Sequence, residues 1–133
     1  MPKKITIVKI EASGRGINHD LQWLSQSLGM FSLRDKEKSC FRIFVELLKA
    51  AKNNKPISSD ELAYKLNLTR GTVVHHLKKL KASGIVVIKG KGYILRVRNL
   101  NSLIREIKKD MDETLGVIQG IAKSIDKALN MDK

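Results

Sequence analysis

The sequence predicts a mainly α-helical fold with one small β-hairpin, preceded by a strand and a short helix and followed by a long helix. Three observations support this prediction. Apolar residues recur at helical spacing over most of the chain. Two short β-branched runs flank Gly90-Lys91-Gly92, which is typical of a hairpin turn. From residue 100 onward, a seven-residue apolar repeat indicates a long amphipathic helix.

The length and composition favour one intracellular domain with an appendage. The chain has 133 residues, a hydrophobic content of 42% and a mean hydropathy of −0.21, which together exclude a wholly disordered protein. No apolar run is long enough to span a membrane, and the start of the chain does not resemble a signal peptide. The single cysteine, Cys40, cannot form an internal disulfide. We therefore expect a cytoplasmic protein without a membrane segment.

Residues 1–34 are predicted to form an N-terminal extension. The β-branched run KITIVKI at residues 4–10 predicts a strand. Residues 17–28 then place an apolar residue on one helical face at each turn, with Asn18 as a candidate cap and Gly29 as a stop. Trp23 lies beside this stripe, where we expect the indole to pack against apolar side chains; the alternative is stacking on a base.

Residues 35–98 are predicted to form the central domain. Helical spacing over 35–52 ends at Asn53-Asn54-Lys55-Pro56. Ser58 and Glu61 then fit a capping box for a short helix that would bury Leu62 and Leu66. Asn67-Leu68 forms a tight turn, and Thr69 caps a second helix that ends at Gly84. Strands are predicted at 85–89 and 93–98.

Two short helices joined by a tight turn and followed at once by a hairpin make a winged helix-turn-helix. The segment TRGTVVHHLKKLKASGIV resembles the recognition helix of winged-helix transcriptional regulators of the ArsR and MarR type, and SSDELAYKLNL resembles the helix before it. This resemblance covers about residues 36–98. The whole chain also resembles small archaeal winged-helix proteins. The resemblance implies that the hairpin is the wing and that the second helix enters a DNA groove.

The charge distribution indicates a polyanionic partner. Between Leu62 and Arg105 there is no acidic residue but there are ten lysines or arginines. Of the net charge of +13, residues 1–34 contribute +3, residues 35–98 contribute +10, and residues 99–133 are neutral. Positive charge concentrated on a helix that can enter a groove is typical of nucleic-acid-binding proteins.

Helical periodicity divides the second helix into two faces. Val73, Leu77 and Leu80 share the predicted core face, and the opposite face is predicted to meet nucleic acid. Base contacts are assigned to three residues: Arg70, Val74 and His75. Phosphate contacts are assigned to lysines on the helix and the hairpin. The full predicted set is Thr69, Arg70, Gly71, Thr72, Val74, His75, Lys78, Lys79, Lys81, Lys89, Lys91, Arg96 and Arg98.

Arg96 and Arg98 belong to this set because they share one face of the second predicted strand and because no acidic neighbour in the sequence is available to pair with them.

No metal or cofactor is expected. His75 and His76 are adjacent and point about 100° apart on a helix, so they cannot chelate one ion together. Metal-sensing ArsR proteins use paired cysteines or histidine–carboxylate clusters, from which this chain departs. No catalytic motif is present, so no enzymatic activity is expected.

Residues 99–133 are predicted to form a dimerisation helix. A stripe about four heptads long exceeds what a small winged domain can cover, which favours a partner helix in a homodimer. The alternative is packing on the chain's own helix at 17–28. Gly116 and Gly120 are candidates for allowing close helix approach. The predicted interface consists of Leu100, Ile104, Ile107, Met111, Thr114, Ile118, Ile121 and Ile125.

Three functions are compatible with these features. The leading prediction is a homodimeric, sequence-specific regulator of transcription that binds double-stranded DNA, with the helix at 69–83 in the major groove and the wing at 85–98 on the backbone. The alternative is a factor that binds structured RNA or the ribosome through the same basic face, favoured by four further bases outside the central domain: Lys3, Lys4, Lys9 and Arg15. A third, weaker hypothesis is a protein-interaction adaptor built on the C-terminal helix.

Overall fold

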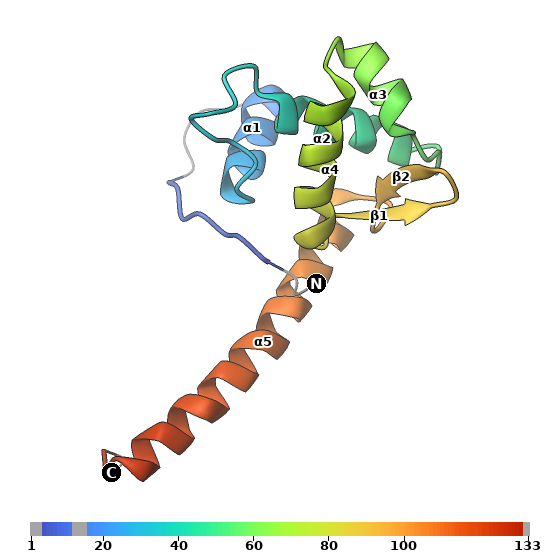
Figure 1. Cartoon of the computed structure of the whole chain (residues 1–133). Coiled ribbons are helices and arrows are strands. Elements are labelled where there is room, and N and C mark those ends of the chain that lie inside the picture. The colour runs from blue at the N-terminus through green and yellow to red at the C-terminus, as the bar shows by residue number, and fades with distance from the viewer. Residues whose placement is uncertain (1–3, 12–15, 132–133) are drawn as a thin grey trace.

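The computed structural model describes residues 4–11 and 16–131 and shows a mainly helical fold with one hairpin (Figure 1). No described helix combines the length and apolar composition that crossing a bilayer requires. In chain order the elements are α1 (Ile17–Ser27), α2 (Ser39–Ala51), α3 (Ser59–Leu66), α4 (Arg70–Ala82), β1 (Val86–Lys89), β2 (Gly92–Leu95) and α5 (Leu100–Ala128). The predicted fold class is confirmed, apart from the N-terminal strand.

The strand predicted at residues 4–10 is wrong. This segment is extended, but its backbone pairs with the ends of helices instead of a neighbouring strand. The amide of Lys4 donates to the carbonyl of Ala82 at 2.9 Å, and that of Val8 donates to Ser27 at 2.8 Å. The last carbonyls of a helix lack partners within the helix, so they are available to an extended segment that passes by. The β-branched composition therefore favoured the extended backbone without providing a sheet.

The helix α2 starts four residues later than predicted. The carboxylate of Asp35 accepts hydrogen bonds from the amides of Ser39 (2.8 Å) and Cys40 (3.0 Å), which satisfies two unpaired donors at the start of the helix. The buried face of α2 centres on Phe44 and Leu47. Apolar residues cover most of the circumference of α2, so their spacing alone did not determine which face is buried.

The two helix caps predicted in the central domain are confirmed. The hydroxyl of Ser58 accepts from the amide of Glu61 at 3.1 Å, and that of Thr69 accepts from the amide of Thr72 at 3.2 Å. Between these helices, Asn67 has a left-handed backbone with φ 54°, which allows the tight turn. Both α3 and α4 pack on α2, and α4 lies in front of it in Figure 1.

The hairpin is shorter than predicted and is anchored to the chain before α3. Val86 pairs with Leu95 and Lys89 with Gly92, so that Gly90 (φ 63°) and Lys91 form the turn. Tyr93 exchanges backbone hydrogen bonds of 2.8 and 2.9 Å with Ile57. The second strand ends at Leu95, and residues 96–98 lie beyond it.

A single hydrophobic core joins residues from all three predicted segments. It includes Leu28 from the N-terminal segment, Phe44 from the central domain, and Leu103 and Ile107 from α5. All residues from 112 to 131 are exposed. Figure 1 shows this part of α5 extending away from the rest of the molecule. The alternative that α5 covers its stripe by packing on helix 17–28 is therefore wrong.

Candidate nucleic-acid interface

The helix α4 buries one face in the core and exposes the opposite face. Val73 and Leu77 are fully buried and Leu80 nearly so. At 100° per residue, Gly71, His75 and Lys78 follow on the far side of the helix, where all three are exposed. Lys79 and Lys81 are exposed on the flanks, whereas Val74 is partly buried.

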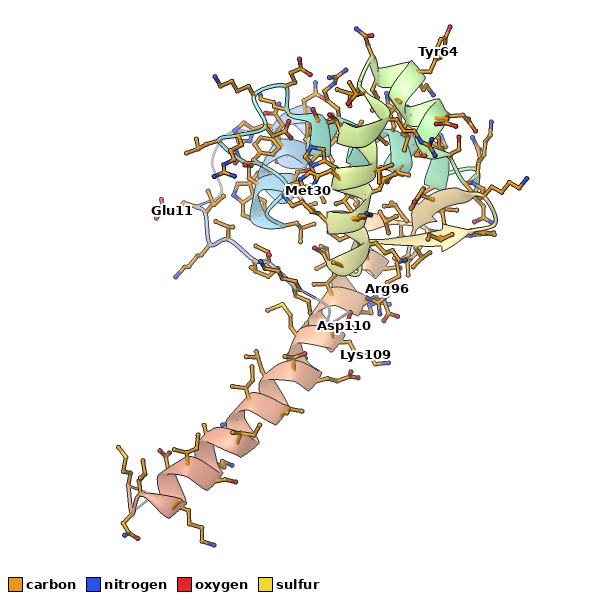
Figure 2. All side chains as sticks on the ribbon, in the orientation of Figure 1. Glu11, Met30, Tyr64, Arg96, Lys109 and Asp110 are labelled. Atoms are coloured by element: carbon orange, nitrogen blue, oxygen red, sulfur yellow. The ribbon has the colours of Figure 1, made fainter. Side chains whose placement is uncertain are left out.

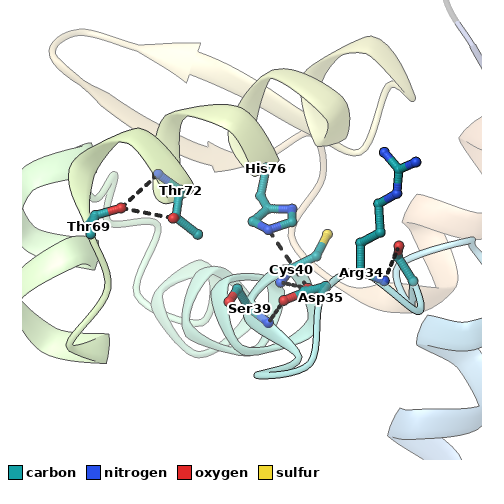
Figure 3. Close-up of polar contacts among 8 residues, drawn as sticks. Arg34, Asp35, Ser39, Cys40, Thr69, Thr72 and His76 are labelled. Atoms are coloured by element: carbon teal, nitrogen blue, oxygen red, sulfur yellow. Dashed lines mark hydrogen bonds and ion pairs between the residues drawn. The ribbon is translucent and has the colours of Figure 1, made fainter.

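The start of α4 is fixed by its own side chains. The hydroxyl of Thr69 accepts from the amide of Thr72 and also donates to the hydroxyl of Thr72 at 2.8 Å (Figure 3). Both threonine hydroxyls thus form hydrogen bonds within the cap. Their role in the candidate interface is therefore to fix the start of α4. The exposed residues that follow are then presented from a rigid first turn.

Arg70 lies on the side of α4 nearer to α3. Its guanidinium is 3.4 Å from the carboxylate of Asp60, and both side chains are about three-quarters exposed, at 73% and 75%. An exposed pair of this kind contributes only about 0–1 kcal/mol. Arg70 can therefore exchange Asp60 for a nucleic-acid group at little cost.

The structure assigns Arg96 a different role from the predicted one. Its guanidinium donates to both oxygens of the Asp110 carboxylate, at 2.6 and 3.3 Å, and lies 3.6 Å from Glu106 (Figure 2). The expectation that Arg96 has no acidic neighbour is wrong, because its partners come from α5, in a different part of the sequence. The hydrogen bond to Asp110 raises the pKa of the Arg96 guanidinium, and the side chain is only 22% exposed. Arg96 therefore holds the wing to α5.

The remaining predicted residues of the wing are exposed. Lys89 and Lys91 lie at the tip of the hairpin, and Arg98 lies just beyond β2. Of the N-terminal bases, Lys4 and Lys9 are exposed, whereas Lys3 and Arg15 lie outside the described residues. The tip of the wing thus presents two lysines within one turn.

A cleft of about 790 Å³ separates α4 from the loop before α2. The exposed loop residues Arg34, Lys36 and Glu37 line one wall. Thr72, His75 and Lys79 line the other. Sequence reasoning did not assign the two loop bases to the interface. The sequence feature that could have indicated them is their position on either side of Asp35. Asp35 caps α2 and thereby holds the loop beside α4.

His76 lies on the wall of this cleft and is buried. Its Nε2 is 3.7 Å from Asp35, and its Nδ1 has no hydrogen-bond partner (Figure 3). Burial lowers the pKa of His76, and the nearby Asp35 opposes this only in part. For Asp35, burial acts to raise the pKa, but hydrogen bonds from Cys40 and Ser39 outweigh it, so the pKa lies below its ordinary value.

Cys40 lies beneath the same loop. It is buried, and its burial raises the pKa of the thiol to about 11. The thiol is therefore protonated and unreactive at neutral pH. Within the described part of the chain, no group of three or more His, Cys, Asp or Glu side chains could hold a metal ion.

The comparison with protein families identifies the segment that carries this surface. Residues 44–94 match the family model described as HTH domain. This segment is a helix-turn-helix domain. The family is a DNA-binding one, and the match runs from the middle of α2 to the end of the hairpin. A search of curated proteins gave no match to the chain.

The HTH domain contains the exposed face of α4 and the wing, but not every part of the candidate interface. The loop with Arg34 and Lys36 precedes the matched residues, and α5 follows them. The family match therefore covers the central part of the candidate interface, and the loop and α5 lie outside the matched residues.

Proposed function

We propose that the protein is a homodimeric regulator of transcription that binds double-stranded DNA at specific sequences, with α4 in the major groove and the wing on the backbone. The observation that carries this proposal is the exposed face of α4 in the HTH domain, which presents Gly71, His75 and Lys78 with lysines on both flanks. A helix of this kind fits the width of the major groove of B-form DNA.

The proposed contacts divide into two kinds. Arg70 and His75 contact base edges, because they lie in the first two turns of α4, and the Val74 side chain meets a thymine methyl from the edge of this surface. Phosphates are bound by Lys78, Lys79 and Lys81 from the helix and by Lys89, Lys91 and Arg98 from the wing. Arg96 is left out because it is held by Asp110.

The homodimer is supported by the outer part of α5. Ile118, Ile121 and Ile125 lie on one face and are each more than half exposed, at 55%, 57% and 53%. A second copy of the helix would remove this apolar face from water. A two-fold dimer presents two α4 helices and favours a near-palindromic DNA site.

Within helix-turn-helix proteins, we assign the chain to winged regulators of the ArsR and MarR type, without the metal ligands of the metal-sensing members. The two-strand hairpin directly after α4 supports this assignment. A regulator of this kind acts where the DNA is, so we place it in the cytoplasm.

The test is to purify the protein from its native cells at about 0.15 M salt, where phosphate contacts persist, and to sequence the nucleic acid that co-purifies. Enrichment of a few short duplex loci with inverted repeats is the expected result. Enrichment of ribosomal RNA, with co-migration of the protein on a ribosome gradient, would contradict the proposal and favour an RNA-binding factor.

A further inference from the structure

The apolar face of α5 has two parts, one covered and one bare. Leu103 and Ile107 are buried against the chain's own core, whereas Ile118, Ile121 and Ile125 are exposed. At 100° per residue, the three exposed isoleucines lie within about 40° of Ile107 around the helix axis. The bare stripe is therefore a direct continuation of the face on which the chain's own domain already sits.

This continuity restricts how a second helix can lie on the stripe. In a parallel pair, the partner's residues 100–111 would lie opposite the same residues of the first copy, on the side that the first copy's domain fills. The two domains would then compete for the space between the two helices. In an antiparallel pair, each domain lies beyond the end of the other helix, and the stripes from residue 112 onward meet without obstruction.

A groove marks the place where an antiparallel partner would end. About 480 Å³ of open space lies between the N-terminal segment and α5, lined by Ile5, Ile7, Met111 and Leu115 together with Lys4 and Thr114. Figure 1 shows the N-terminal segment passing close to α5 where the helix leaves the domain. The stripe from Met111 to Leu129 spans about 27 Å, so a partner centred near residue 120 places its own Leu129 opposite Met111.

We propose that α5 pairs antiparallel with α5 of a second copy, and that the end of each helix, with Leu129, seats in the partner's groove between residues 4–7 and Met111. This proposal rests on the homodimer of the proposed function. It gives the N-terminal segment a role in the interface. Leu129 and Ile7, at 62% and 50% exposed, are then covered at the same contact.

Cross-linking of cysteine variants tests the orientation. In the antiparallel pair, the two copies of an Ile125→Cys variant place their thiols about 15 Å apart along the axis, so they do not form a disulfide. A mixture of differently tagged Leu115→Cys and Ile125→Cys chains places two thiols side by side and yields a mixed disulfide dimer. The native chain is the control, because its own Cys40 is buried. Rapid disulfide formation by Ile125→Cys alone would show a parallel pair and overturn the proposal.

Two neighbouring substitutions test the groove. Ile7→Lys introduces a charge where the partner's helix end seats, so we expect the dimer dissociation constant from sedimentation equilibrium to rise about tenfold or more. Val8→Lys is the matched control: Val8 is 41% exposed on the same segment but does not line the groove, so its effect should stay within about twofold. Equal effects of the two substitutions would contradict the seat in the groove.

The molar mass of the native protein in solution distinguishes the antiparallel arrangement from the homodimer on which it rests. A monomer by light scattering at all concentrations would overturn both the homodimer and its orientation. A dimer that fails only the cross-linking test or only the Ile7→Lys test leaves the homodimer in place and overturns the antiparallel arrangement or its groove, respectively.

Discussion

The guanidinium of Arg96 donates two hydrogen bonds to the carboxylate of Asp110, at 2.6 and 3.3 Å, and this bidentate pair links the end of the wing to α5. The backbone amide of Arg96 also donates a hydrogen bond to the carbonyl of Ile85, at 3.0 Å, so both its main chain and its side chain are fixed. The end of the hairpin is thereby tied to α5. Together with the buried Leu103 and Ile107, this pair holds α5 against the rest of the fold.

Replacing Arg96 by alanine tests this structural role. Arg96→Ala removes the two hydrogen bonds that the part-buried Asp110 accepts from the guanidinium, so we expect the free energy of unfolding, measured by urea denaturation, to fall by about 1–3 kcal/mol. The salt dependence of DNA binding should not change. Arg98→Ala is the control, since Arg98 is exposed: its stability should be unaltered and its salt dependence weaker. Unchanged stability and a weaker salt dependence for Arg96→Ala would instead indicate that Arg96 contacts phosphate.

The contrast between Thr69 and Arg96 shows what could be predicted from the sequence. The cap formed by Thr69 depends on a residue three positions away, so a local pattern was sufficient to predict it. The partner of Arg96 lies fourteen residues away on a different element, and its position depends on how α5 packs. The acid-free window in the sequence therefore did not imply an acid-free surface in space.

The same limit applies to the apolar repeat of α5. Its periodicity predicted the helix and the stripe, but not which part the chain's own domain covers. Ile107 and Leu100 were predicted at a dimer interface, yet Ile107 is buried in the core and Leu100 packs against it. A substitution at Ile107 would therefore disturb the fold itself. In the outer half, Ile118 and its neighbours remain candidates for the interface.

Arg70 and Lys91 should differ in how their loss affects DNA binding. Arg70→Ala removes a proposed base contact, so we expect a loss of about 1–3 kcal/mol on the specific site and a smaller loss on random duplex. Lys91→Ala removes a proposed phosphate contact at the tip of the wing, so it should weaken binding to all sequences alike. Titrations of both duplexes by fluorescence anisotropy provide the measurement. Equal losses of Arg70→Ala on both duplexes would count against its contact with a base.

The loop before α2 should contribute phosphate contacts of its own. Arg34 and Lys36 face α4 across the cleft, so a backbone that passes beside the helix comes within their reach. For Arg34→Ala with Lys36→Ala, we expect the slope of log affinity against log salt to fall in magnitude by about 1.8, or 0.9 for each phosphate. Lys123→Ala with Lys127→Ala, on exposed α5, is a control of equal charge. A common slope for both double variants would exclude the loop from the interface.

Gly116 and Gly120 are expected to weaken α5 without serving the interface. At 100° per residue they lie on the side opposite to Ile118 and Ile125, and a Cβ added at either meets nothing within 4 Å. Gly116→Ala with Gly120→Ala should therefore stabilise the helix by up to about 1 kcal/mol per site, with a higher melting temperature and an unchanged dimer mass. Dissociation of this variant into monomers would instead support the close helix approach that their spacing suggested.

His76 should make the stability of the fold sensitive to acid. Its folded-state pKa lies below the ordinary value of 6.5, mainly because the ring is buried, so the unfolded chain binds more protons than the folded one as the pH falls. The sign follows directly: stability is fully present above about pH 6.5 and declines below it. Asp35 also has a lowered pKa, but its effect begins only below its ordinary value of 3.8. Urea denaturation between about pH 5 and 7 should show this decline in the native chain and a flatter profile for His76→Gln. A decline that persists in His76→Gln would place the acid sensitivity elsewhere in the fold.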